Sequence, residues 1–335
     1  GDVYKRQLGA PELISTKFNY YDNYIHATPK TGILYEGFGK VNEKFIHAFP
    51  TNTLAMHFCP CELQKFALES GRFNVVEDNV DPKDVDADYV FDCRGTPKDF
   101  TGYTPLKSPV NAAILGKPKW DSKELWSRHV ATPDGWTFII PTHSESPSHD
   151  YCVGYCYNSN ITSKEDAESN LSSMFDVEIK KHLKFKNYLA KNPIVDDRIF
   201  LNGNRLFFLE PLESSSVQAY VECARFFVDY IITKKESIEQ AACSAKQYIR
   251  QLQNFVLWHY QFGSKYDTPF WDYATKLSFK DKTFDAMVEY CLQTSKRDIL
   301  PKSYGGMTSE LSQYGQWPAN SFKVWYEGMT KREEK

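Results

Sequence analysis

Residues 135–141 read GWTFIIP and residues 151–157 read YCVGYCY, and these two apolar stretches decide the kind of fold. Both are rich in aromatic and β-branched side chains, which favour β-strands. A stretch rich in serine, histidine and proline separates them, so we predict two strands joined by a loop. Trp136 and Phe138 lie two residues apart and therefore share one face of the first strand, which is predicted to be buried.

Working outward from this pair, the chain alternates short strands and helices before it becomes mainly helical. Strands are predicted at residues 88–92 and 205–209, and helices at residues 62–70 and after the capping residue Ser163. From about residue 217 onward the pattern is helical, with a long helix or a helix pair at 237–260 and another helix at 280–294. The predicted class is α/β (α+β), with a soft domain boundary near residue 235.

The composition excludes several classes of protein. The chain has 335 residues, enough for a buried core, of which 41% are hydrophobic and 25% charged. No apolar stretch reaches the ~18 residues of a membrane span, and a net charge of −3 argues against a broad nucleic-acid-binding face. We expect neither a membrane nor a nucleic acid as partner. The 7 Trp, 21 Tyr and 23 Phe are predicted to build mainly core, with some lining a pocket for a flat ligand.

The eight cysteines are scattered and form no C-x-x-C pair, which favours reduced thiols and a cytoplasmic location. One cluster stands out, residues 57–61 with the sequence HFCPC. Its histidine and thiols are of the types that bind zinc, but no second ligand pair follows at zinc-finger distance. No metal site is predicted, and the segment is expected to be the end of a strand that runs into a helix.

Three segments contain the residues best suited to chemistry: 27–33 (ATPKTGI), 135–141 (GWTFIIP) and 208–216 (FLEPLESSS). Each also has an ordinary interpretation. Lys30 can be a solvated loop lysine, and Trp136 can be one buried side chain of a strand. Glu213 can accept hydrogen bonds from the amides that begin the following helix.

Taken together and in this order, the segments resemble those of the flavin-dependent tryptophan halogenases. Viral, cyanophage-type members are a candidate nearest group. The likeness runs from Leu8 to Met329, nearly the whole chain. Further segments that carry it are residues 8–12 (LGAPE), 56–58 (MHF), 91–95 (FDCRG), 259–260 (HY) and 267–271 (DTPFW).

The resemblance implies an FAD-dependent, monooxygenase-like and Rossmann-related flavin module with a helical substrate-binding part. Reduced FAD, oxygen and halide ion give hypohalous acid, which passes along a tunnel to a separate substrate pocket. By this resemblance, Lys30 hydrogen-bonds the hypohalous acid or is converted to a haloamine. Glu213 stabilises the positive intermediate or accepts its proton. Reduced FAD would come from a separate flavin reductase, because no NAD(P)H site is visible.

Other site residues follow from the same resemblance. The tunnel motif comprises Trp136, Phe138, Ile140 and Pro141. The halide- and flavin-side residues are Asn204, Pro211, Ser215 and Ser216. The residues expected to stack on the substrate are His47, Phe49 and Trp317. Two departures matter: Phe138 replaces a second tryptophan, and Ser216 replaces a glycine, so a positive φ at residue 216 would be strained.

The family's opening strand with G-x-G-x-x-G is not found in the sequence, and the GFG at residues 37–39 lacks the third glycine. We therefore expect a chain truncated at its N-terminus, with residues 1–7 (GDVYKRQ) non-native. The predicted division is an incomplete flavin-binding and halogenase core at 1–235 and a helical substrate-side module at 236–335.

Three functions remain open at this point. The first is halogenation of a small electron-rich aromatic, either a tryptophan- or indole-like compound or a phenol. The second is hydroxylation of an aromatic by a flavin monooxygenase, motivated by Phe138 and Ser216. The third is a truncated, non-catalytic fragment that binds an aromatic. The order and number of matching segments favour the first.

Overall fold

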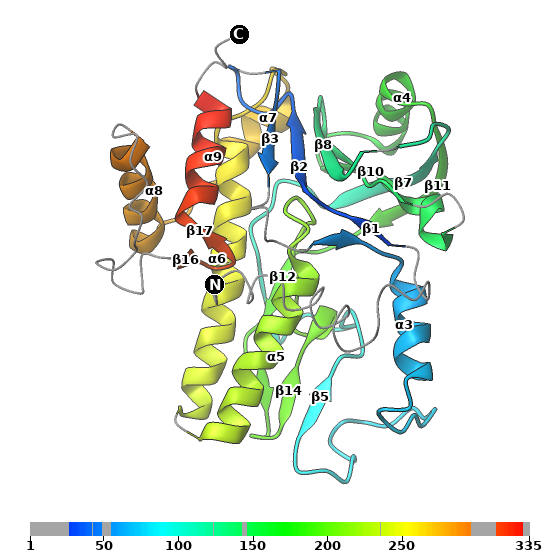
Figure 1. Ribbon diagram of the computed structural model, residues 1–335, viewed down its shortest axis with the longest axis vertical. Coiled ribbons are helices and arrows are strands. Elements are labelled where there is room, and N and C mark those ends of the chain that lie inside the picture. Colours follow the sequence, from blue (N-terminus) through cyan, green and yellow to red (C-terminus); the bar gives the residue numbers. More distant parts are fainter. Residues whose placement is uncertain are drawn as a thin grey trace.

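The computed structural model describes residues 27–41, 43–48, 55–122, 124–142, 146–234, 236–295 and 313–330. It has a mixed α/β architecture, as predicted, with a large sheet at one end and long helices along one side (Figure 1). The helices are α3 Pro60–Glu69, α4 Lys164–Met174, α5 Ser216–Thr233, α6 Ile238–Gln261, α7 Pro269–Ala274, α8 Lys282–Ser295 and α9 Ala319–Thr330, with 3-10 turns η1 Pro147–Tyr151 and η2 Gly203–Arg205. The strands are β1 Thr28–Pro29, β2 Gly32–Glu36, β3 Lys44–Ala48, β4 Met56–His57, β5 Val90–Asp92, β6 Tyr103–Pro105, β7 Ala112–Pro118, β8 Trp126–Thr132, β9 Gly135–Ile139, β10 Val153–Tyr157, β11 Val177–Lys184, β12 Tyr188–Ala190, β13 Ile194–Val195, β14 Ile199–Leu201, β15 Phe207–Phe208, β16 Gln313–Tyr314 and β17 Trp317–Pro318.

The largest sheet of the described residues has seven strands in the order β11-β7-β10-β9-β8-β2-β3. The predicted strand pair is confirmed, since β9 and β10 lie next to each other and run antiparallel. The second strand begins at Val153 rather than at Tyr151, because residues Pro147–Tyr151 form a 3-10 turn. Of the pairings in this sheet, β2 with β8 is parallel, and β2, the strand that follows β1, lies between β8 and the edge strand β3.

Phe138 on β9 lies opposite Gly154 on β10, and the aromatic ring covers the glycine backbone. A Cβ atom added at Gly154 would lie 2.0 Å from the Phe138 ring, far inside contact distance. The Phe138 ring of the predicted tunnel motif therefore occupies the space that any side chain at residue 154 would need. This local arrangement explains why a glycine is placed in the interior of a central strand.

Replacing Gly154 with alanine is expected to lower the free energy of unfolding by about 1–3 kcal/mol, because the new methyl group overpacks against the Phe138 ring. Urea denaturation of Gly154→Ala, Phe138→Leu and the double variant measures this coupling. The alanine should cost much less in the Phe138→Leu background. Equal costs in both backgrounds would show that the ring does not oppose the methyl group.

The helices begin where their capping residues predict. The side chain of Ser163 accepts a hydrogen bond from the Asp166 amide at the start of α4. Ser237 and Gln240 form a reciprocal capping box at the start of α6, which is one continuous helix. The strand predicted at residues 205–209 was too long: only Phe207–Phe208 is extended, because Gly203–Arg205 form a 3-10 turn.

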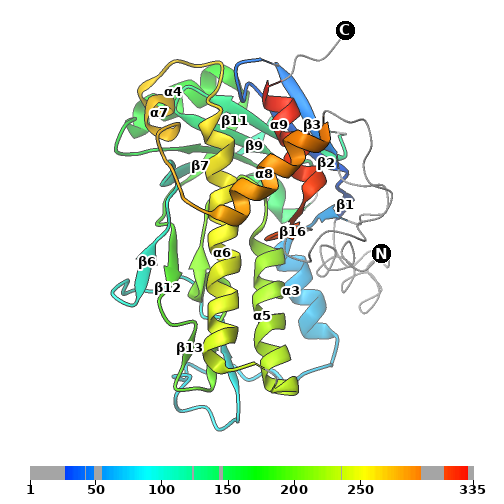
Figure 2. The same cartoon turned by 90° about the vertical axis from the view of Figure 1, so that its left-hand side faces the viewer.

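Helices α5 and α6 lie side by side in both views and pack against each other (Figures 1 and 2). A single hydrophobic core contains residues of the sheet, of α5 and α6, and of α9, among them Trp136, Phe227, Phe255 and Trp325. The predicted boundary near residue 235 falls between α5 and α6, and the division into two modules stays a prediction. None of the helices in the described ranges combines the length and the hydropathy that a bilayer crossing requires.

Candidate active site

Lys30 lies in the short connection between β1 and β2, and its side chain is only 8% exposed. Two backbone hydrogen bonds fix this connection. The Lys30 amide donates to the Ala55 carbonyl at 2.7 Å, and the Thr31 amide donates to the Leu125 carbonyl at 2.6 Å. Lys30 is therefore buried and its backbone is fixed, so it is not a solvated loop lysine, as the ordinary interpretation would have it.

Glu213 lies in the tight turn between β15 and α5 and is 6% exposed. The Ser214 amide donates to the Pro211 carbonyl at 2.8 Å, which closes the turn. The positive φ in this turn, 53°, belongs to Ser214. The expectation of strain at Ser216 was therefore wrong, because Ser216 is the first residue of helix α5 and has an ordinary backbone there.

Three donors from distant parts of the chain converge on the Glu213 carboxylate. The Tyr35 hydroxyl of β2 donates to Oε1. The Nε2 atom of His259, on α6, lies 2.5 Å from the same oxygen, and its Nδ1 faces the Phe255 carbonyl at 2.6 Å. The Trp317 indole donates to Oε2 at 3.0 Å. Glu213 therefore does not serve as a simple helix-capping carboxylate, since its oxygens are held by side chains from three elements.

The pKa values of Lys30 and Glu213 are both lowered, but for different reasons. Burial lowers the pKa of the Lys30 ammonium to about 8, although the Glu213 carboxylate partly counters it. Burial opposes ionisation of Glu213, but the His259 charge and hydrogen bond outweigh it and lower the pKa of Glu213 to about 2. At neutral pH the site therefore holds a cationic Lys30 and an anionic Glu213.

Three further buried histidines, His47, His57 and His129, stay neutral near Lys30 and Glu213. Burial, reinforced by the Lys30 charge, lowers the pKa of His57 and His129 to about 3. Burial also lowers the pKa of His47, which feels the charges of Glu213 and Lys30. The structure thus brings the predicted residue His47 into the electrostatic neighbourhood of Lys30 and Glu213.

A second carboxylate of the same turn, Glu210, is held in a similar way. It accepts hydrogen bonds from Trp136 Nε1 at 3.2 Å, from Ser108 Oγ at 2.5 Å and from the Tyr260 hydroxyl. Burial raises the pKa of Glu210 to about 7, and these hydrogen bonds limit the rise. Trp136, predicted as a tunnel residue, therefore anchors β9 to the turn that carries Glu213.

Sequence reasoning missed Tyr35, His259 and Tyr260 as site residues. The pair at 259–260 was noticed only as part of the resemblance. In the structure these consecutive residues of α6 contact the two glutamates of one turn, His259 with Glu213 and Tyr260 with Glu210. Two adjacent polar side chains in an otherwise apolar helical stretch were the available signal.

The remaining predicted site residues are the end of the tunnel motif, Trp317, the residues assigned to the flavin side, and Phe49. Ile140 and Pro141 follow β9 directly, and Trp317 is 4% exposed with its ring stacked on Phe255 at 3.9 Å. Among the residues predicted for the flavin side, Asn204 accepts a hydrogen bond at Oδ1 from the Tyr220 hydroxyl at 2.6 Å. A hydrogen bond with Ser216 lowers the pKa of that hydroxyl against the stronger effect of burial. Ser215 caps α5 and is buried. Phe49, like residues 1–12, lies outside the described residues.

The described residues do not form a complete flavin site. They contain no glycine-rich strand–turn–helix of the kind that holds a dinucleotide pyrophosphate. The side chain of Asn204 is already engaged by Tyr220.

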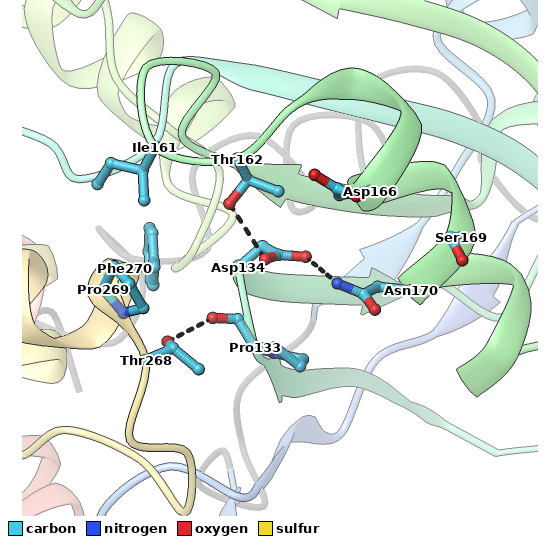
Figure 3. Close-up of a pocket in the computed structure, with 10 residues that line it drawn as sticks. All are labelled: Pro133, Asp134, Ile161, Thr162, Asp166, Ser169, Asn170, Thr268, Pro269 and Phe270. Atoms are coloured by element: carbon cyan, nitrogen blue, oxygen red, sulfur yellow. Dashed lines mark hydrogen bonds between the residues drawn. The ribbon is translucent and has the colours of Figure 1, made fainter.

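A separate cavity of about 350 Å³ opens between α4, α7 and the turn joining β8 to β9 (Figure 3). Asp134 lines it and accepts hydrogen bonds from Thr162 and Asn170, while Thr268 donates to the Pro133 carbonyl. The polar groups there are thus used to hold loops together, and Lys30 and Glu213 are not among the lining residues. In the part of the chain that is described, no group of three or more His, Cys, Asp or Glu is placed to hold a metal ion.

Comparison with known proteins identifies the family. The model of the tryptophan halogenase family matches residues 78–296. The chain belongs to the tryptophan halogenase family. This confirms the prediction made from the ordered segments. Among relatives of known sequence, the tryptophan 6-halogenase ThaL of Streptomyces albogriseolus is 22% identical over 237 residues, which are 69% of this chain and 42% of ThaL.

Solved structures of halogenases share the fold. The tryptophan 5-halogenase MibH superposes with a TM-score of 0.74 at 17% identity, covering 98% of this chain and 78% of MibH. BrvH, a flavin-dependent halogenase from Brevundimonas sp. BAL3, gives 0.68 at 16% identity, covering 92% of this chain and 78% of BrvH. At these identities the likeness establishes the fold, and the match to ThaL spans less than half of that protein.

Proposed function

We propose that this halogenase-family chain transfers a halogen from hypohalous acid to a small electron-rich aromatic, such as an indole or a phenol. The observation that carries the proposal is the buried Lys30 ammonium, which is electrostatically coupled to the Glu213 carboxylate that Tyr35, His259 and Trp317 hold in place. Reduced flavin and halide, on which the family depends, supply the oxidant together with oxygen, and the reduced FAD comes from a separate reductase. Backbone amides at Ser215 and Ser216 are the proposed halide contact.

The residues support a balanced halogen transfer. The Lys30 ammonium donates a hydrogen bond to the oxygen of hypohalous acid, which makes the halogen more electrophilic. A ring carbon attacks the halogen, the O–X bond breaks, and the oxygen leaves as water with a proton from Lys30. The cationic ring intermediate is stabilised by Glu213, which then accepts the proton of the substituted carbon. Passing that proton back to Lys30 restores the site.

The weak basicity of Glu213 is no obstacle to this role. A protonated, halogenated ring is a very strong acid, so even a carboxylate with a pKa of about 2 removes its proton readily. What the low pKa secures is a permanent negative charge facing the cationic intermediate. His47 and Trp317, together with Phe49, are proposed to bound the substrate pocket through their aromatic faces. One face of the Trp317 ring is already covered by Phe255.

Product mass separates this proposal from hydroxylation. The protein is incubated with tryptophan, indole or phenol, bromide, oxygen, and FAD reduced by a separate flavin reductase. The expected product shows the nearly equal pair of isotope peaks that bromine gives, and it requires bromide. Gain of one oxygen without bromide would favour the monooxygenase. A folded protein that retains no flavin and forms neither product would favour the non-catalytic fragment.

The packing of the Phe138 ring on Gly154 keeps a bulky side chain at the position where the family has its second tryptophan, which supports the halogenase over the monooxygenase.

A further inference from the structure

The motif at residues 57–61 is not used by the proposed halogen transfer, yet it brings two thiols together. Cys59 precedes helix α3, Pro60 is the first residue of the helix and Cys61 is the second. The two Sγ atoms lie 2.7 Å apart. Cys59 is 1% exposed, whereas Cys61 is exposed to solvent. An almost covered thiol thus touches an accessible one across a single proline.

The surroundings favour the thiolate form of Cys59. Burial opposes ionisation, but hydrogen bonds from Cys61, from Ser148 and from backbone amides at the start of α3 outweigh it and lower the pKa of Cys59 to about 7. The hydrogen bond with Cys59 raises the pKa of Cys61. At neutral pH about half of Cys59 is therefore thiolate, while Cys61 remains a thiol.

The pair also lies on the same two-stranded ribbon as Lys30, where the oxidant is proposed to act. Strand β4 ends two residues before Cys59 and pairs with β1, placing His57 opposite Thr28, two residues before Lys30. The Lys30 amide donates to the Ala55 carbonyl, just before β4, and the Lys30 charge acts on His57. Along this ribbon Cys59 lies four residues beyond Ala55, the partner of Lys30, which is roughly 13 Å of extended chain.

We propose that Cys59 and Cys61 form a redox-active dithiol that hypohalous acid oxidises to an intramolecular disulfide. The Cys59 thiolate attacks the halogen, which forms an S–X bond and releases hydroxide. The Cys61 thiol then attacks the Cys59 sulfur, which forms the S–S bond, displaces halide and releases a proton. Two thiols and one hypohalous acid thus give a disulfide, halide, a proton and water. Thiol reductants reverse the oxidation. The source of oxidant rests on the proposed function, whereas the chemistry of the pair does not.

The first experiment supplies the oxidant directly, so it does not depend on halogenase activity. The reduced whole chain is treated with less than one equivalent of hypochlorite, remaining thiols are alkylated, and tryptic peptides are weighed. Residues 45–65 form one tryptic peptide that contains both cysteines. We expect this peptide to lose two hydrogens and to escape alkylation. Its loss of free thiol should be about tenfold faster than at the exposed Cys93, whose pKa is raised by burial and by Asp92.

Single substitutions assign the two roles. In Cys61→Ser the Cys59 thiol should still be consumed rapidly but should stop at the sulfenic acid, which dimedone traps. In Cys59→Ser the Cys61 thiol should react no faster than Cys93. Earlier oxidation of Cys93 or of Met56 than of the pair would overturn the proposal, as would rapid disulfide formation that needs neither Cys59 nor Cys61.

The second experiment connects the pair to the active site. During turnover with reduced FAD, oxygen and bromide, with catalase present to remove hydrogen peroxide, the disulfide should form only when bromide is added. Disulfide formation in the hypochlorite titration but not during productive turnover would overturn the link to Lys30. A chain that forms the disulfide with hypochlorite but makes no brominated product would instead refute the proposed function and leave the dithiol intact.

Discussion

Replacing Lys30 with alanine is expected to lower aromatic halogenation by at least about a thousandfold, because the oxidant loses its hydrogen-bond donor in a buried site. Bromide-dependent consumption of reduced flavin should continue, since Lys30 acts after the oxidant has formed. Product is measured by mass spectrometry, and escaping hypobromite by a chlorination- and bromination-sensitive dye. Product formation at the wild-type rate in Lys30→Ala would show that Lys30 has no part in halogen transfer.

The pH dependence distinguishes the two roles that the resemblance allows for Lys30. Burial lowers its pKa to about 8, so at pH 7 the ammonium outnumbers the free amine by about ten to one. If the ammonium polarises hypohalous acid, the turnover rate should fall as the pH rises through about 8. A haloamine requires the free amine, and the rate would then rise over the same interval. We expect the turnover rate to fall over this interval. The side chain of Lys30→Arg stays charged, so an active Lys30→Arg enzyme should show no such fall.

The sequence predicted the local structure well wherever one short segment contains the whole signal. The strand at 135–139, the cap at Ser163 and the helix that begins after Ser237 depend on side chains within a few residues of one another. The resemblance also singled out Lys30 and Glu213, which the structure buries and couples electrostatically. These residues belong to short segments whose number and order, taken together, carry the resemblance.

The partners of those residues could not be predicted, because they come from far along the chain. Tyr35 is 178 positions from Glu213 and His259 is 46 positions away, and no local pattern specifies such contacts. The strain expected at Ser216 was misplaced for a related reason. Which residue of a turn adopts positive φ depends on where the next helix starts, and α5 starts at Ser216. The match of Phe138 to Gly154 likewise depends on strand register.

Replacing Glu213 with glutamine is expected to lower the turnover rate by about a hundredfold to a thousandfold, because the cationic ring intermediate loses both its counter-charge and its proton acceptor. The substitution also leaves His259 and Lys30 without the carboxylate that they share electrostatically. A thermal unfolding curve and the KM for the aromatic are measured alongside the rate. A fall in rate with an unchanged KM and a cooperative transition assigns the effect to the chemical step.

Glu210→Gln is the matched control, since Glu210 lies in the same turn, is equally buried and is also held by side-chain donors. Burial raises its pKa to about 7, so below that pH the wild-type side chain is largely neutral and a neutral amide is a close substitute. At pH 6 the Glu210 variant should therefore lose far less activity than the Glu213 variant, whose wild-type carboxylate is ionised at that pH. The difference in activity loss between the two variants should narrow above pH 7, where wild-type Glu210 becomes charged and the glutamine no longer resembles it. Equal losses at pH 6 would mean that the turn needs two acceptors for its shape rather than one negative charge for the reaction.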